Sequence, residues 1–210
     1  MERIVYLERE SIIADVRRPA CDHAWSEYAR TSQAEVEARL ADATIALVNK
    51  LMLDAETIAR LPMLKMIAVA ATGTNNVDLD ACRARGIVVS NIRGYAVHTV
   101  PEHAIALMLA LSRNLVAYRD SIQAGRWQES EQFCFFDHPI QDLHGATLAV
   151  IGSGSLGEGV ARLAAAFGMK VLRSERKGIA DSRAGYTPFT EALATADVVS
   201  LHFPLTPETT

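Results

Sequence analysis

The sequence predicts an α/β protein built on parallel β-sheets. Short apolar segments alternate with amphipathic helical segments along the whole chain, which is the βαβα order of a parallel sheet covered by helices on both faces. A glycine-rich turn, Gly152–Gly157, lies between an apolar segment and a helical one, as in doubly wound nucleotide-binding sheets. Half of the 210 residues are apolar and 22% are charged, so the chain can bury the core of one large or two small domains.

The first part of the chain predicts one complete α/β unit. Strands are expected at residues 3–7, 44–48, 66–71 and 87–91. Helices are expected at residues 24–30, 33–42, 54–61 and 78–84. Asp54 is suited to cap the start of the third helix and Gly86 to end the fourth, because aspartate accepts from free N–H groups and glycine adopts the left-handed conformation.

A longer helix should run from Val100 to past Leu115. Thr99 is its expected N-cap, with Glu102 three residues later completing a capping box. Residues 126–146 lack periodicity but are rich in aromatic residues, so they should form an arm packed on something, such as another subunit. The alternation then resumes with a strand at 147–151, a helix at 156–167, a strand at 169–174, a helix at 189–195 and a strand at 197–201.

The charge balance favours small polar molecules as partners. Lys and Arg number 21 against 25 Asp and Glu, for a formal charge of −4 with both signs interspersed, so we expect no nucleic-acid partner. Cys21, Cys82 and Cys134 form no CxxC pair, which predicts neither a disulfide framework nor a metal site. The charged N-terminus and the lack of a long apolar segment predict a cytoplasmic protein with no membrane partner.

The glycine-rich turn carries the clearest chemical signal. In the pattern GxGxxG, Gly152 permits a tight turn, Gly154 lets the backbone touch a pyrophosphate, and Gly157 allows a helix to pack closely on a strand. Ser155 and Leu156 complete the predicted cofactor-binding turn, because the N–H groups at a helix start attract phosphates. The alternative, a turn without a ligand, requires neither three glycines nor an acidic residue at the next strand end.

That acidic residue is Glu175, about 20 residues after the turn, where a carboxylate accepts hydrogen bonds from the hydroxyls of an adenine ribose. Arg176 and Lys177 follow it directly. They either meet a 2′-phosphate or belong to a solvated turn. Because a carboxylate repels phosphate, the sequence favours NAD as cofactor and leaves NADP open.

A second candidate site lies in residues 70–78, between an expected strand and helix. The backbone N–H groups at Thr72 and Gly73 could hold a carboxylate, because open α/β sheets bind ligands at the carboxyl ends of their strands. A plain turn, with Asp78 at the start of the following helix, explains the segment equally well.

Five segments together resemble the NAD-dependent D-2-hydroxyacid dehydrogenases, most closely their glycerate dehydrogenase (hydroxypyruvate reductase) branch. These segments are ATGTNNVDLDACRARGI, NIRGYAVHTVPEHAIALMLALSRNL, GRWQESEQFCFFDHPIQDLHG, IGSGSLG, and VLRSERKG followed by VSLHFPLTPETT. The resemblance implies that residues 1–96 form a flavodoxin-like substrate-binding domain. Residues 97–210 would then form the first part of a Rossmann NAD-binding domain, which is incomplete in this chain.

The resemblance also implies roles for particular residues. Thr72 and Gly73 match the position that binds the substrate carboxylate, and Thr99 matches a position beside the nicotinamide. Phe203, Pro204 and Thr209 match the loop that borders the adenosine half, and Arg176 is included among the cofactor-binding residues. Residues 126–146 match part of a homodimer contact. Thr99 could equally be an N-cap alone, and Phe203–Pro204 a strand end alone.

The implied activity is hydride transfer between NAD(H) and a small D-2-hydroxy acid or 2-keto acid, such as glycerate and hydroxypyruvate or glyoxylate. The family's catalytic Arg, Glu and His are expected beyond residue 210, so no catalytic residue is predicted in this chain and the chain alone is expected to be inactive. A non-catalytic NAD-sensing protein, like the corepressors of the same fold, is the alternative. A methyltransferase also has a glycine loop, but the motifs upstream of the turn argue against it.

Overall fold

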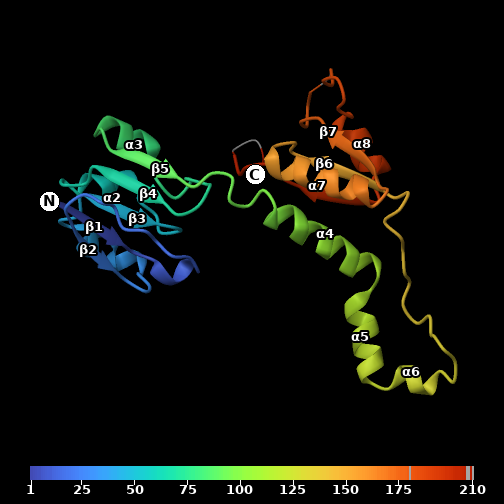
Figure 1. Cartoon of the computed structure of the whole chain (residues 1–210). Helices are drawn as coiled ribbons and strands as arrows, with labels where there is room; N and C mark the ends of the chain where they lie inside the picture. Colours follow the sequence, from blue (N-terminus) through green and yellow to red (C-terminus); the bar gives the residue numbers. More distant parts are fainter. Residues whose placement is uncertain (180, 207–208, 210) are drawn as a thin grey trace. The chain divides into compact units, whose positions relative to one another are not determined.

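The computed structural model describes residues 1–179, 181–206 and 209 of the chain. The chain divides into two compact units, Met1–Gly94 and Tyr95–Thr210, called here the N-terminal and C-terminal units. Each contains a parallel β-sheet with helices packed on it (Figure 1). The predicted α/β fold class is therefore confirmed. The functional assignment of residues 1–96 and 97–210 as two domains stays a prediction.

The N-terminal unit is built on a five-stranded sheet with the order β2-β1-β3-β4-β5, and neighbouring strands are parallel. Its strands are β1 (Glu2–Tyr6), β2 (His23–Glu27), β3 (Ile45–Val48), β4 (Met66–Val69) and β5 (Val88–Asn91). Its α-helices are α1 (Val36–Leu40), α2 (Ala55–Ala59) and α3 (Leu79–Ala84), with 3-10 segments at Arg9–Ser11 and Gln33–Glu35.

Local signals account for the helix ends in this unit. Oδ1 of Asp54 accepts a hydrogen bond from the backbone N–H of Thr57 at 2.8 Å, so the predicted cap of α2 is confirmed. Asp78 caps α3 in the same way, through the N–H of Ala81 at 2.8 Å. Gly86 follows α3 with φ +68°, the left-handed conformation that commonly ends a helix.

The prediction of a helix at residues 24–30 is wrong, because residues 23–27 form the strand β2. It pairs in parallel with β1, with Glu2 opposite His23 and Ile4 opposite Trp25. His23 and Trp25 are half-buried whereas Ala24 is exposed, which is the two-residue period of a strand. Alanine and glutamate favour a helix locally, but pairing with the open edge of β1 outweighs that preference.

The C-terminal unit is built on a three-stranded parallel sheet with the order β7-β6-β8. Its strands are β6 (Thr147–Ile151), β7 (Lys170–Ser174) and β8 (Val198–Leu201). Its helices are α4 (Thr99–Ser112), α5 (Leu115–Gln123), α6 (Arg126–Glu129), α7 (Ser155–Ala166) and α8 (Phe189–Thr195). In the described part of the chain, no helix is both long enough and apolar enough to cross a membrane.

The long helix predicted from Val100 past Leu115 is interrupted. Helix α4 ends at Ser112, and Asn114 adopts the left-handed conformation with φ 48° before α5 begins. Asparagine tolerates this conformation better than most residues. The prediction that Thr99 caps α4 is also wrong, because His98 is the N-cap. Thr99 is already part of the helix, since the N–H of Glu102 bonds to the carbonyl of His98 at 3.0 Å.

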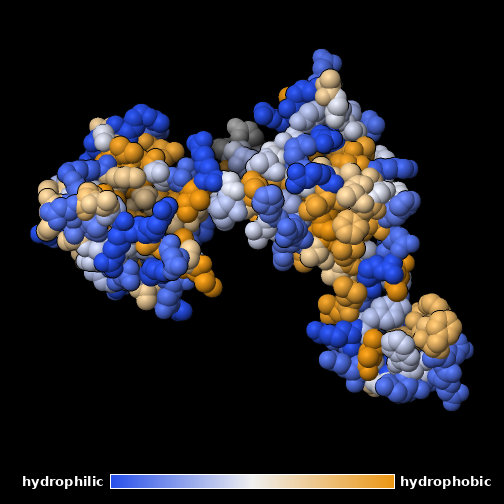
Figure 2. All heavy atoms as spheres, in the orientation of Figure 1, coloured by the Kyte–Doolittle hydropathy of each residue, from blue (hydrophilic) through white to orange (hydrophobic). Residues whose placement is uncertain are grey.

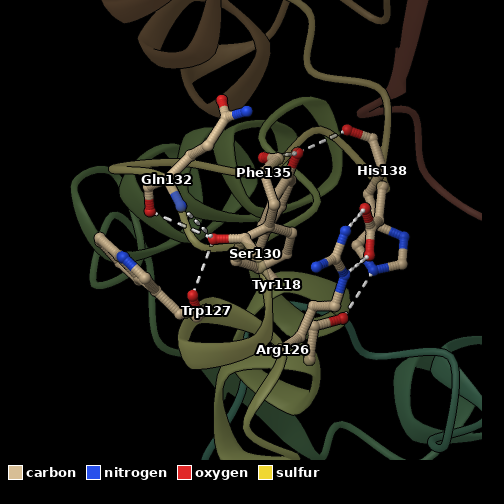
Figure 3. A network of polar contacts seen from close by, with 9 residues as sticks. Tyr118, Arg126, Trp127, Ser130, Gln132, Phe135 and His138 are labelled. Atoms are coloured by element: carbon tan, nitrogen blue, oxygen red, sulfur yellow. Dashed lines mark hydrogen bonds and ion pairs between the residues drawn. The ribbon is translucent and has the colours of Figure 1, made fainter.

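Residues 115–142, which include most of the expected segment 126–146 and are called the arm from here on, form a polar and aromatic network of their own (Figure 3). The hydroxyl of Tyr118 donates to the carbonyl of His138 at 2.8 Å, and Oγ of Ser121 lies 2.9 Å from Nε2 of the same histidine. Arg126 forms a two-pronged ion pair with Asp137 at 2.6 and 3.0 Å. These contacts explain how a segment without regular periodicity keeps a defined shape.

Helices α4 and α7 cross at very close range. A Cβ atom added to Gly159 in α7 would lie 2.6 Å from the Pro101 ring in α4, so only glycine permits this approach. The apolar core beside the crossing includes Ile105 and Met108 from α4 and Leu148 and Val150 from β6. The close crossing fixes the first turn of α4 against the helix that follows the glycine-rich turn.

Candidate functional site

The glycine-rich turn directly follows β6, as the sequence predicts. Gly152 has φ +95°, and a Cβ atom there would lie 2.6 Å from the backbone carbonyl of His202 and 2.8 Å from the nitrogen of Phe203. The turn therefore passes against the chain that leaves β8. Any side chain at position 152 would both strain the backbone and separate these two segments.

Gly157 allows the start of α7 to pack on the turn itself. A Cβ atom at this position would lie 2.0 Å from the carbonyl oxygen of Gly152 and 3.1 Å from Cγ1 of Val150. Real Cβ atoms essentially never come closer than 3.0 Å to such atoms. The third glycine of the motif thus has the packing role that its spacing predicts.

Gly154 differs from both, because its surroundings are open. It is the N-cap residue of α7 with φ −73° and ψ −174°, a conformation that any residue adopts, and it makes no side-chain cap. Among the described residues, no atom lies within 4 Å of an added Cβ. The helix start carries N–H groups and a positive dipole end, so this open space fits a diphosphate group held by Gly154, Ser155 and Leu156.

Glu175 follows β7 and is almost completely enclosed, with 2% of its surface exposed. Its Oε1 accepts from the backbone N–H of Arg176 at 2.9 Å and from Nη2 of Arg183 at 2.8 Å. Its Oε2 accepts from the backbone N–H and from Nε of Arg183 at 3.1 and 2.7 Å. These bonds, the arginine's first, lower the pKa of the Glu175 carboxyl to about 2.

Two residues that the sequence does not predict as part of the site, Arg183 and Tyr186, lie in the loop after β7. The guanidinium of Arg183 stacks over the Tyr186 ring at 3.9 Å, and the Tyr186 hydroxyl hydrogen-bonds with that of Ser153 in the glycine-rich turn. Two backbone hydrogen bonds of 2.8 Å, between Thr187 and the end of β7, anchor the loop. Spacing alone gives no sign of these contacts, because the loop has no periodic pattern.

A surface depression of about 260 Å³ lies beside the glutamate. It is lined by Glu175, Arg176, Ile179 and Arg183. Arg176 and its neighbour Lys177 are exposed, so cationic side chains surround the position where the sequence predicts an adenine ribose. The geometry brings the acidic strand end and the predicted Arg176 together in one place.

The remaining predicted cofactor residues of the C-terminal unit lie on two segments. Phe203 and Pro204 follow β8, and the backbone of Phe203 passes beside Gly152. Oγ1 of Thr209 donates to the carbonyl of Pro204 at 2.8 Å, which closes this segment on itself. Thr99 is exposed at the start of α4, the end of the helix that crosses α7.

In the N-terminal unit, Thr72 and Gly73 are exposed in the loop after β4. The side chain of buried Asn76 anchors this loop, because it donates to the carbonyl of Leu51 at 2.9 Å. The side chain of Asn91 donates to the carbonyl of Thr72 at 2.7 Å. In the part of the chain that the structure describes, no acceptor binds the backbone N–H of Thr72 or Gly73. Both donors are therefore available to a carboxylate.

Comparison with known proteins identifies the family. Residues 105–210 match the sequence profile of the D-isomer specific 2-hydroxyacid dehydrogenase, NAD binding domain. The chain belongs to the D-isomer-specific 2-hydroxyacid dehydrogenase family. The resemblance in its motifs is thereby confirmed, and the glycine-rich turn lies within the NAD-binding domain of this family.

Relatives within the family match along almost the whole chain. A protein of Haemophilus influenzae assigned to the 2-hydroxyacid dehydrogenases is 49% identical over 99% of this chain and 66% of its own length. Glycerate dehydrogenase of Methylorubrum extorquens is 46% identical over 99% of this chain and 65% of its own length. The structure of Aquifex aeolicus D-lactate dehydrogenase, complexed with NAD and lactic acid, matches with a TM-score of 0.74 and 27% identity over 98% of this chain and 62% of that one. The chain thus spans about two thirds of the length of these curated relatives.

Proposed function

We propose that this protein transfers a hydride between NAD(H) and a small D-2-hydroxy acid or 2-keto acid. The proposed substrates are either the pair glycerate and hydroxypyruvate, or glyoxylate. The observation that carries the proposal is the open cradle at Gly154, next to two glycines that no other residue could replace. The 46% identity to a glycerate dehydrogenase supports the choice of substrate.

This chain's own residues would bind and orient both reactants. The N–H groups from Gly154 to Leu156 would hold the cofactor diphosphate, and those of Thr72 and Gly73 would hold the substrate carboxylate. When bound, the nicotinamide supplies the hydride that reduces the keto carbon. Thr99 would border the nicotinamide. We assign no catalytic acid to residues 1–210, and the cytoplasmic location stays a prediction.

The test is oxidation of NADH by the protein that contains this chain, with hydroxypyruvate, glyoxylate or pyruvate as acceptor. The expected result is turnover that depends on the keto acid and is fastest with hydroxypyruvate or glyoxylate. Binding of NADH without turnover on any of the three would refute the enzymatic proposal and favour the NAD-sensing protein.

We further propose that the protein is a homodimer whose contact includes the arm. Large apolar side chains are exposed on α4, α5 and α6 and on the segment that follows: Leu107, Leu111, Leu115, Val116, Ile122, Trp127, Phe133, Phe136 and Ile140. Figure 2 shows hydrophobic side chains gathered along α4 and α5. Phe133 and Phe136 are 86% and 84% exposed, and large exposed apolar patches usually mark interaction sites.

The proposed dimer can be tested by the mass of the protein in solution. Changing Phe133 and Phe136 to Ser should convert a dimer into a monomer in sedimentation velocity, because both rings then lose their apolar contact. Leu205→Ser is the control, since Leu205 is 73% exposed but lies outside the arm. A wild-type protein that sediments as a monomer at all concentrations would contradict this proposal without affecting the enzymatic one.

A further inference from the structure

The carboxylate that the sequence assigns to the adenine ribose has no capacity left for it. Glu175 already accepts four hydrogen bonds, two on each oxygen, and a carboxylate offers about four acceptor sites. Only 2% of the residue is exposed. The 2′- and 3′-hydroxyls of a ribose would have to displace Arg183 before they could donate to this group.

The groups that remain accessible at the same depression are donors. The side chain of Arg183 is 54% exposed although it forms the ion pair with Glu175. Arg176 also lines the depression, and within the described residues it has no ion-pair partner. Counting Lys177 and Asp181 as well, this stretch has three cations against two carboxylates, so its exposed face is positive.

Arg183 is also held in a fixed orientation. Its guanidinium donates to the Glu175 carboxylate and stacks over the Tyr186 ring, whose centroid is 3.9 Å away. Its backbone N–H bonds to the same carboxylate at 3.1 Å, and Tyr186 is tied to Ser153 of the glycine-rich turn. A guanidinium that is already ordered loses little entropy when it binds a phosphate.

We propose that Arg183 determines cofactor choice in this protein, by neutralising Glu175 and presenting a cationic face that accepts a 2′-phosphate on the adenosine ribose. The proposal rests on the proposed function, because it assumes that a dinucleotide binds at the glycine-rich turn. It extends the cofactor choice from NAD, which the sequence favours, to NADP as well. That preference depends on an accessible carboxylate, whereas Arg183 covers the one at position 175.

The experiment compares the binding of ADP-ribose with that of 2′-phospho-ADP-ribose by isothermal titration calorimetry. Both probes carry the diphosphate and differ only at the 2′ position. The wild-type chain should bind the phosphorylated probe at least as tightly as ADP-ribose. Arg183→Gln should weaken the phosphorylated probe at least tenfold, because a charge-assisted contact is lost, and should leave ADP-ribose unchanged or bound more tightly.

Two further variants keep the result interpretable. Lys170→Gln removes an exposed cation at the start of β7, the opposite end of the strand from Glu175, so it should change either affinity by less than about threefold. Glu175→Gln keeps the shape of the side chain and removes its negative charge, so it should preserve or increase binding of the phosphorylated probe. Circular dichroism identifies any variant that has unfolded, and Glu175→Gln then provides the decisive comparison.

The outcomes separate the two proposals. A wild-type chain that binds ADP-ribose tenfold more tightly than its 2′-phosphate, with a ratio that Arg183→Gln leaves unchanged, overturns the role of Arg183. The dinucleotide site itself would still stand. If neither probe binds, and Gly154→Val behaves as the wild type does, the dinucleotide site is refuted and the role of Arg183 is refuted with it.

Discussion

Two glycines of one turn should fail in opposite ways when a side chain is added. At Gly157, the methyl group of alanine would lie 2.0 Å from the Gly152 carbonyl oxygen, where about 3.0 Å is the closest approach observed for real Cβ atoms. The backbone would have to move by about 1 Å. At Gly154 an added Cβ meets no described atom within 4 Å, so valine fits the folded chain and fills the space assigned to the diphosphate.

The sizes of the two effects follow from these distances. Overpacking typically costs about 1–3 kcal/mol, and Gly157→Ala should fall at the upper end because backbone, not a flexible side chain, is in the way. A loss of about 2–3 kcal/mol lowers the Tm of a domain of this size by roughly 10 °C. Gly154→Val should change the free energy of unfolding by no more than about 1 kcal/mol and weaken ADP binding at least tenfold.

Urea denaturation followed by circular dichroism measures the stability of both variants, and calorimetric titration with ADP measures binding. The packing role of Gly157 is refuted if Gly157→Ala unfolds at the same urea concentration as the wild type. The binding role of Gly154 is refuted if the valine variant binds ADP with unchanged affinity. A valine variant that is as unstable as Gly157→Ala would show that the space around Gly154 is not open.

Three further predictions concern stability. The carboxyl of Glu175 has a pKa of about 2 in the folded chain, against 4.5 ordinarily. Its stabilising contribution is therefore complete above about pH 4.5 and is lost as the pH falls toward 2. NMR titration of the carboxyl groups measures this pKa, and comparison with Glu175→Gln identifies the resonance. Asp78→Ala should lower the free energy of unfolding by about 1 kcal/mol, because the cap of α3 is lost. The control Asp80→Ala breaks only an exposed ion pair with Arg83 and should lower it by no more than about 0.5 kcal/mol. Urea denaturation measures both. Asn114→Ala should cost about 1–2 kcal/mol by the same measurement, because alanine tolerates the left-handed conformation poorly.

The sequence predicts well those features that depend on neighbouring residues. The glycine-rich turn, its flanking strand and helix, and the cap at Asp54 are each determined within a few residues, and each lies where it is expected. Gly152 has the positive φ of a tight turn, and Gly157 is explained by its close approach to Gly152 in the same turn. For these features a local pattern and the tertiary structure impose the same requirement.

Features decided by distant partners could not be predicted in this way. Strand β2 exists because β1 offers an edge about twenty residues earlier in the chain, and its own residues favour a helix. The occupation of Glu175 by Arg183 depends on how the loop after β7 folds back on the strand. A carboxylate at the right place in a motif indicates a site, but only the folded loop shows which group occupies that carboxylate.

The strand orders of the two sheets have a consequence for how the chain assembles during synthesis. In the order β2-β1-β3-β4-β5, every new strand joins an edge that earlier strands already provide, and the order β7-β6-β8 has the same property. No strand has to be inserted between two that are already paired. Each sheet can therefore grow outward in the sequence in which the ribosome releases it, so that apolar segments find a template soon after they emerge.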